Sequence, residues 1–114
     1  MEMKKMKIDV LGTEYFVFRR TKAEDRELEV CDGYCDHTAK KIVVTLKDPE
    51  CTLECFDVYI KKVMRHEIIH AFLFESGLHE NFKHEPWGHD ETVVDWIAVQ
   101  FPKLLKAFKA VDCL

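Results

Sequence analysis

Two histidines and a glutamate stand together in the segment His66-Glu67-Ile68-Ile69-His70. In an α-helix, histidines four residues apart lie about 40° apart around the axis and ~6 Å along it, so both imidazoles can bind one metal ion. Glu67 is rotated by one residue from His66, and its carboxylate can lie beside the metal without binding it. From there it can take a proton from a metal-bound water, whose pKa zinc lowers toward ~7. The spacing therefore predicts that His66 and His70 bind Zn²⁺ and that Glu67 is the general base.

The residues around this motif predict a helix. Between Thr52 and Ser76, apolar residues recur at three- and four-residue steps, which is the period of an amphipathic helix. Gly77 is a suitable terminator. Ile68 and Ile69, inside the motif, are apolar, as an active-site helix packed against a core requires. We therefore expect one long helix to carry all three residues.

A catalytic zinc ion needs a third protein ligand and leaves one position open. Glu91 is the favoured third ligand, because Asp95 follows four residues later on the same face of the next predicted helix. Asp95 can then accept a hydrogen bond from the outward nitrogen of a ligating histidine and fix its tautomer. His84 and His89 are the alternative third ligands, and substitution of Glu91 alone distinguishes the two schemes.

The motif followed by Glu91 and Asp95 resembles the gluzincin clan of zinc peptidases, in which H-E-x-x-H is followed by E-x-x-x-D. In size and element order the chain is also similar to single-domain minigluzincins and to small metallopeptidase-type proteins of phages and mobile elements. Three segments carry this likeness: 32–36, 65–72 and 94–98. The resemblance implies two histidine ligands, a general base, a third ligand and an acid that orients a histidine: His66 and His70, Glu67, Glu91, and Asp95.

The function implied by this resemblance is that of a zinc-dependent endopeptidase acting on a peptide or protein substrate. Thermolysin-like enzymes take their transition-state donors from a later region, so here the donor for the tetrahedral intermediate is left open among His84, His89, Tyr34 and Arg65. An extended substrate would add to a sheet edge, for which Lys41 to Leu46 is the predicted strand.

Two other functions stay open. With His84 or His89 as third ligand, the chain would be a small SprT-like zinc protease. With four protein ligands, the zinc would be structural, and the chain would be a non-catalytic interaction or regulatory module. The pairs Cys31/Cys35 and Cys51/Cys55 are weaker candidates for such a site, because their spacing differs from the usual two intervening residues.

Composition favours a single domain over residues 1–114. The 114 residues are 47% hydrophobic and 33% charged, which allows a modest core. The net charge of −4 is spread over interspersed acids and bases, so neither nucleic acid nor a membrane is an expected partner. No apolar run approaches the ~18 residues of a membrane span, and no export signal opens the chain. An odd number of cysteines, 5, favours free thiols and a cytoplasmic location.

Strand patterns precede the helical ones. Lys7 to Leu11 and Tyr15 to Arg19 predict a hairpin, and Gly33 to Cys35 with Lys41 to Leu46 predict a second pair of strands. Two aromatic residues of the hairpin are expected in the core: Phe16 and Phe18.

A second helical pattern begins at Asp90, which can cap it, and Pro102 either kinks this helix or starts another. The order of elements predicts an α+β fold. We expect a small, mostly antiparallel N-terminal sheet packed against the active-site helix and one or two C-terminal helices, a minimal zincin-like arrangement.

Overall fold

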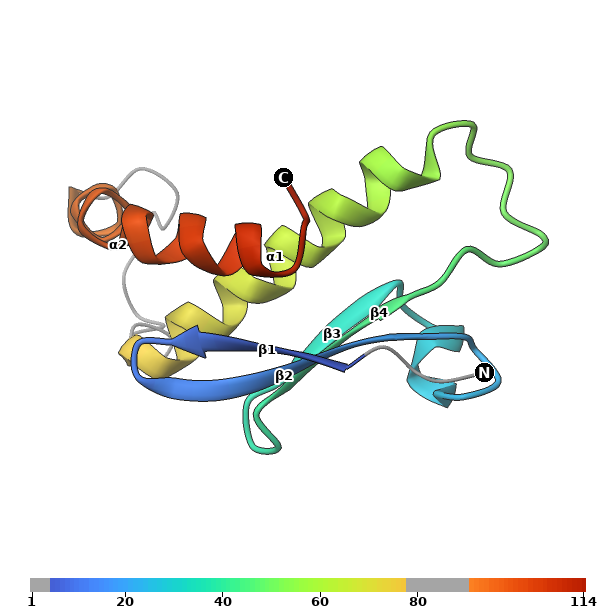
Figure 1. The fold of residues 1–114 in the computed structure, drawn as a ribbon, viewed down its shortest axis with the longest axis horizontal. Helices are drawn as coiled ribbons and strands as arrows, with labels where there is room; N and C mark the ends of the chain where they lie inside the picture. Colours follow the sequence, from blue (N-terminus) through green and yellow to red (C-terminus); the bar gives the residue numbers. More distant parts are fainter. Residues whose placement is uncertain (1–4, 78–90) are drawn as a thin grey trace.

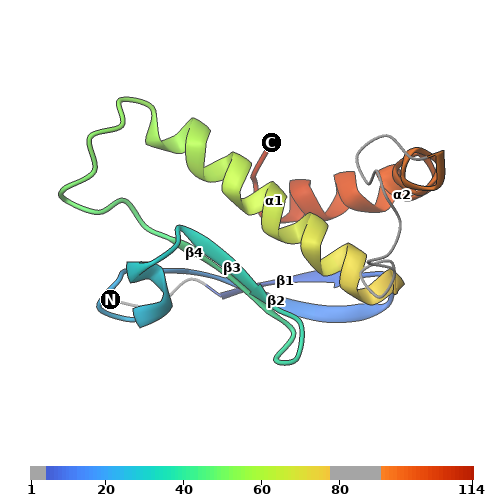
Figure 2. The same cartoon turned by 180° about the vertical axis from the view of Figure 1, so that it is seen from behind.

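The computed structural model describes residues 5–77 and 91–114, apart from the side chains of Glu91, Val94, Asp95 and Ala98. A four-stranded mixed sheet, in the order β1-β2-β4-β3, precedes two helices. The elements are β1 (Lys5–Val10), β2 (Thr13–Arg20), the short 3-10 helix η1 (Arg26–Glu29), β3 (Gly33–Asp36), β4 (Lys41–Thr45), α1 (Phe56–Ser76) and α2 (Glu91–Ala110). Figure 1 and the reverse view in Figure 2 show both helices on the same side of the sheet. The predicted α+β class is confirmed.

The hairpin of β1 and β2 turns a different face to the core from the one expected. Side chains alternate along a strand, and it is Tyr15 and Val17 that are completely buried against the helices. Phe16 and Phe18 are partly exposed on the outer face, so their predicted place in the core is wrong. The Arg20 guanidinium carbon lies 4.2 Å from the ring centre of Phe18, which shows that a cation covers this outer aromatic ring.

β4 lies inside the sheet, parallel to β2 and antiparallel to β3. The prediction that Lys41 to Leu46 forms a sheet edge is therefore wrong. Three consecutive residues, Ile42, Val43 and Val44, have no exposed surface. Such a continuous apolar run is typical of a strand covered on both faces. The edge on this side of the sheet is β3.

Gly33 brings α1 close to β3. A Cβ atom at Gly33 would lie 2.8 Å from Val63 Cγ1 of α1 and 3.2 Å from Val44 Cγ1 of β4, and the first distance is too short for a real contact. The missing side chain therefore lets the helix pack directly on the edge strand.

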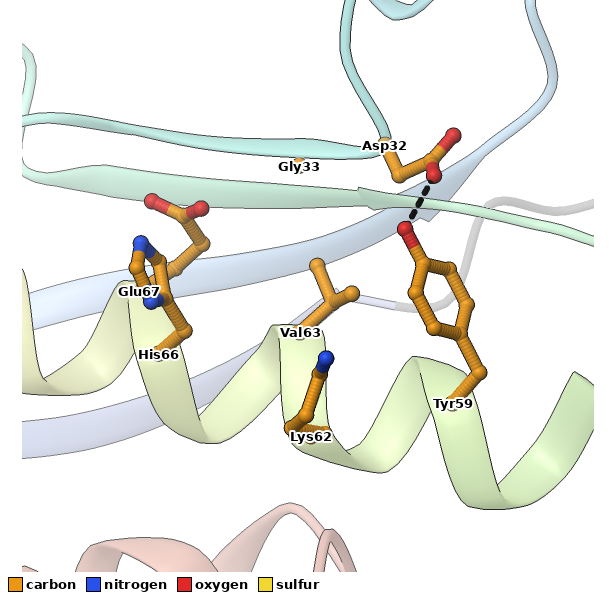
Figure 3. Close-up of a pocket in the computed structure, with 7 residues that line it drawn as sticks. All are labelled: Asp32, Gly33, Tyr59, Lys62, Val63, His66 and Glu67. Carbon is orange, nitrogen blue, oxygen red and sulfur yellow. Dashed lines mark hydrogen bonds between the residues drawn. The ribbon is translucent and has the colours of Figure 1, made fainter.

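Contacts at both ends of β3 give its direction relative to α1. Near the start of the strand, the Tyr59 hydroxyl of α1 donates a hydrogen bond to the Asp32 carboxylate. Just after the strand, the His37 ring stacks on Phe74 near the end of α1, with ring centres 4.1 Å apart. β3 and α1 therefore run side by side in the same direction, as Figure 3 shows for their first halves.

α2 is one helix with Pro102 inside it. Figure 1 shows its orange first part nearly end-on and its red remainder lying across the view, so the helix bends, as expected for an internal proline. Its last turns bury Leu104, Ala107 and Phe108 in the core shared with α1 and the sheet. Within the described residues, neither helix combines the length and apolar character needed to cross a membrane.

Candidate metal centre

His66 and His70 lie side by side on the exposed face of α1. Their Nε2 atoms are 3.1 Å apart, and their ring centres are 4.6 Å apart. Two nitrogens that bind one tetrahedral zinc ion at 2.0–2.1 Å lie ~3.3 Å from each other. Burial and the nearby charge of His66 lower the pKa of His70, which favours the neutral imidazole that binds metals. The pair therefore fits a zinc ion held by both rings.

Glu67 differs from its two neighbours because it is buried. Its residue is 8% exposed, and its carboxylate points toward β3 (Figure 3). Burial raises the pKa of this carboxyl group, while the charge of His66 acts in the opposite direction. Among the described residues no donor forms a hydrogen bond with it. A poorly solvated carboxylate of this kind is a stronger base than an exposed one.

A pocket of about 380 Å³ opens beside the histidine pair, in the groove between α1 and the start of β3. Figure 3 shows its lining: Asp32, Gly33, Tyr59, Lys62, Val63, His66 and Glu67. Glu67 and His66 thus border a space that is open to a small molecule or a side chain.

The predicted third ligand, Glu91, is the first residue of α2, but its side chain and that of Asp95 lie outside the described part of the chain. His84 and His89 lie outside it as well. Within the described side chains, no group of three His, Cys, Asp or Glu residues can hold a metal ion. The third ligand therefore stays a prediction, and the histidine pair is the part of the site that the structure brings together.

The first part of α2 does contact the helix that carries the histidines. The Trp96 ring packs edge-on against Phe72 of α1, with ring centres 6.5 Å apart. Glu91 begins the same helix five residues before Trp96. The helix of the predicted third ligand is therefore packed against the helix of the other two.

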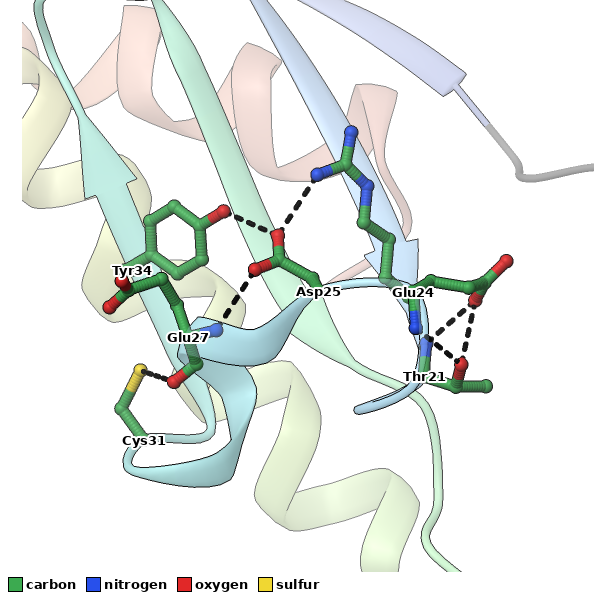
Figure 4. A network of polar contacts seen from close by, with 7 residues as sticks. Thr21, Glu24, Asp25, Glu27, Cys31 and Tyr34 are labelled. Carbon is green, nitrogen blue, oxygen red and sulfur yellow. Dashed lines mark hydrogen bonds and ion pairs between the residues drawn. The ribbon is translucent and has the colours of Figure 1, made fainter.

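Two of the donors considered for the tetrahedral intermediate are engaged elsewhere. Tyr34 follows Gly33 in β3 and so faces away from α1; its hydroxyl donates to Asp25, which also accepts from Arg20 (Figure 4). Arg65 Nη1 donates to the main-chain oxygen of Cys113 at 2.7 Å. Neither group is directed at the histidine pair.

The cysteines do not form the alternative zinc site. All five are free, and the four of the two C-x3-C pairs form no metal-binding group with the described residues. Cys35 lies in β3 near Glu67, where burial, together with the charges of Glu67 and neighbouring acids, raises the pKa of its thiol to about 12. Cys55 is exposed just before α1.

Three polar residues of the pocket were not identified as site residues from the sequence. Lys62 lies four residues before His66, so the helical period places both on one face of α1 and was a usable signal. Tyr59 lies a further three residues back on the same helix. Asp32 comes from the segment before β3, and its position depends on the pairing of distant elements.

Comparisons with protein-family models, with curated proteins and with solved structures found no match to this chain. A function is therefore inferred from the chemistry of its residues and their arrangement.

Proposed function

We propose that this chain is a zinc-dependent endopeptidase of the gluzincin type. The observation that carries the proposal is the pairing of His66 and His70, whose Nε2 atoms are 3.1 Å apart, next to a buried Glu67. Burial of a carboxylate lowers the stability of the folded chain. A carboxylate beside two converging imidazoles is also the arrangement that activation of a metal-bound water requires. The pocket beside these residues supplies room for a substrate.

Each residue has a defined task in this proposal. His66, His70 and Glu91 would hold a zinc ion, which when bound would supply an acidified water and polarise the substrate carbonyl. Glu67 accepts the proton of the attacking water and then delivers it to the leaving amine. The raised pKa of Glu67 lies closer to neutral pH than that of an exposed carboxyl group, so Glu67 can both accept a proton and return it. Asp95 orients a ligating histidine through its outward nitrogen.

β3 is an edge strand of the sheet and, within the described residues, pairs only with β4, so its outer edge offers a place for an extended substrate. The amide of Thr45 donates to the Asp32 carbonyl at 2.9 Å, which makes these two residues a hydrogen-bonded pair of the antiparallel ladder. Such pairs alternate, so the main-chain groups of Gly33 and Cys35 face away from the sheet. A peptide that pairs with them lies along the groove beside Glu67, and β3 replaces Lys41 to Leu46 as the proposed binding edge.

The proposed partner is a peptide or an unfolded segment of a protein. The proposed location is the cytoplasm, where thiols stay reduced, and it is supported by the free state of all five cysteines.

Cleavage of a peptide mixture, read by mass spectrometry, tests the proposal. Zinc-loaded wild-type protein is expected to cut peptides, while Glu67→Gln binds the same amount of zinc and cuts at least ~100-fold more slowly. Equal cleavage by both proteins would show that the activity does not come from this site.

The third ligand needs separate variants. Glu91→Ala is expected to lose zinc, whereas His84→Ala and His89→Ala are expected to retain it. Loss of zinc in a histidine variant, with retention in Glu91→Ala, would favour the SprT-like arrangement instead.

A further inference from the structure

In the proposed peptidase mechanism, the pocket beside Glu67 lies on the leaving-group side of the substrate. Glu67 delivers its proton to the leaving amine, so the substrate residue that carries this amine must lie next to the Glu67 carboxylate. Glu67 and His66 form one end of the pocket, and Tyr59 and Asp32 form the other (Figure 3). The side chain of that residue therefore enters this pocket.

Lys62 brings a positive charge to a pocket that is also lined by the carboxyl groups of Asp32 and Glu67. It lies one helical turn before His66, and Figure 3 shows its amine between His66 and Tyr59. Its Nζ atom lies 5.4 Å from the centre of the Tyr59 ring. Lys62 is exposed, and with the described residues it forms no ion pair. Lys62 and His66 are separated by one helical turn, ~5.4 Å along the axis. The side chain of the substrate residue that follows the cleaved bond can span this distance.

Asp32 is the opposing charge, and its situation differs from that of Lys62. Its carboxylate already accepts the hydroxyl proton of Tyr59, so part of its hydrogen-bonding capacity is used. It lies on the strand side of the pocket, whereas Lys62 lies on the helix side. Asp32 and Glu67 weaken the attraction of a substrate carboxylate, but within the described residues neither forms an ion pair with Lys62.

We propose that Lys62 makes this pocket selective for a carboxylate on the substrate residue that follows the cleaved bond. Two sources can supply the carboxylate: an Asp or Glu side chain within a longer peptide, or the free C-terminus when the last residue is released. The proposal rests on the proposed peptidase function and adds its substrate class.

Two matched pairs of peptides separate these sources. The first pair differs in Glu or Gln after the cleaved bond, within a peptide sequence already found to be cut. The second pair ends one residue after the cleaved bond and carries a free or an amidated C-terminus. Initial rates are measured with zinc-loaded wild-type protein and with four variants: Lys62→Met, Lys61→Met, Asp32→Asn and Glu67→Gln.

Lys61→Met is the matched control, because Lys61 is the next lysine on α1 but lines a different pocket, with Asp57 and Ile60. Wild-type protein is expected to favour the carboxylate in at least one pair by about fivefold in kcat/KM, as for an exposed ion pair. Lys62→Met is expected to abolish that preference, Lys61→Met to keep it, and Asp32→Asn to increase it.

The two levels of the proposal fail in different ways. Cleavage that depends on Glu67 but is equal for both members of each pair would overturn the role of Lys62 alone. The same holds if Lys61→Met and Lys62→Met reduce the preference equally. If no peptide is cut in a Glu67-dependent manner, both the peptidase function and the substrate class are wrong.

Discussion

Glu67 and Glu75 lie two turns apart on the same face of α1, but their surroundings shift the pKa values of the two carboxyl groups in opposite directions. Glu75 Oε2 accepts hydrogen bonds from the Tyr15 hydroxyl and from Lys40 Nζ, both at 2.7 Å. Burial alone would raise the pKa of Glu75, but hydrogen bonds from Lys40, Tyr15 and Thr13 lower it overall. Glu67 is buried without such donors among the described residues, and its pKa is raised.

This difference distinguishes an acid that stabilises the fold, Glu75, from an acid whose raised pKa suits it to proton transfer, Glu67. The donors of Glu75 come from β2 and from the turn between β3 and β4. Their hydrogen bonds to Glu75 stabilise the packing of the end of α1 on the sheet. Glu67 gains no such compensation from the described residues, and burial of a carboxyl group without donors lowers stability. Perturbed acids of this kind, in a pocket beside a pair of adjacent histidines, are typical of functional sites.

The largest expected effect is on catalysis. Glu67→Gln is expected to reduce the proposed peptide cleavage by at least ~100-fold, because it removes the proposed general base. Glu75→Gln, a change of the same chemistry two turns away, is expected to retain activity within about threefold, because Glu75 is not part of the pocket. Both are measured as initial rates at saturating zinc. Similar losses in the two variants would remove the distinction between them.

Gly33 packs against Val63, one helical turn before Glu67. A substitution at Gly33 therefore disturbs the packing of α1 near Glu67 rather than near Glu75. Gly33→Ala is expected to lower the free energy of unfolding by about 2 kcal/mol, because the new methyl group overlaps Val63 and moves α1 away from β3. Chemical denaturation measures this loss. The double variant Gly33→Ala/Val63→Ala should recover part of it, and an unchanged stability of Gly33→Ala would show that the helix does not pack on the strand this closely.

Stability is expected to respond to Glu75 rather than to Glu67. Glu75→Gln replaces a carboxylate that accepts two side-chain hydrogen bonds, so its free energy of unfolding should fall by about 1–2 kcal/mol. Glu67→Gln, in metal-free protein, should be as stable as wild type or more stable. A loss in Glu67→Gln as large as that in Glu75→Gln would indicate that Glu67 is also a structural residue.

The pH dependence of these two effects has opposite signs. The pKa of Glu75 is below its ordinary value of 4.5 in the folded chain, so its contribution is fully present above that pH and is lost as the pH falls through the folded pKa. The pKa of Glu67 is raised, so its carboxyl group costs stability as the pH rises from 4.5 through the folded pKa. Denaturation of metal-free wild type and both variants from pH 3 to pH 7 should therefore show the Glu75→Gln deficit shrinking toward low pH, and any Glu67→Gln advantage growing toward neutral pH. Parallel curves for all three proteins would contradict both pKa directions.

Local patterns predicted the helix and the close approach of His66 and His70, because the distance between two histidines four residues apart depends on helical geometry alone. The α+β class followed from the order of strand and helix patterns. The inner face of β2 was not predictable in the same way, since Tyr15, Phe16, Val17 and Phe18 are all apolar and either alternation could face a core.

The order of the strands depended on contacts between distant segments. The pairing of β4 with β2 joins residues that are separated by η1 and β3, and no local signal specifies it. The continuous run Ile42 to Val44 was the available hint that β4 is an inner strand. The position of Asp32 in the pocket depended on the same arrangement, whereas that of Lys62 followed from the helix.

Zinc content, measured by elemental analysis, tests the metal centre most directly. Purified wild-type protein, reconstituted with zinc and freed of excess metal, is expected to hold about one zinc ion per chain. His66→Ala and Glu91→Ala should each lose it, while Lys61→Met, on another side of the same helix, should keep it. Wild-type protein that binds no zinc, or His66→Ala that binds as much as wild type, would contradict a metal site at His66 and His70.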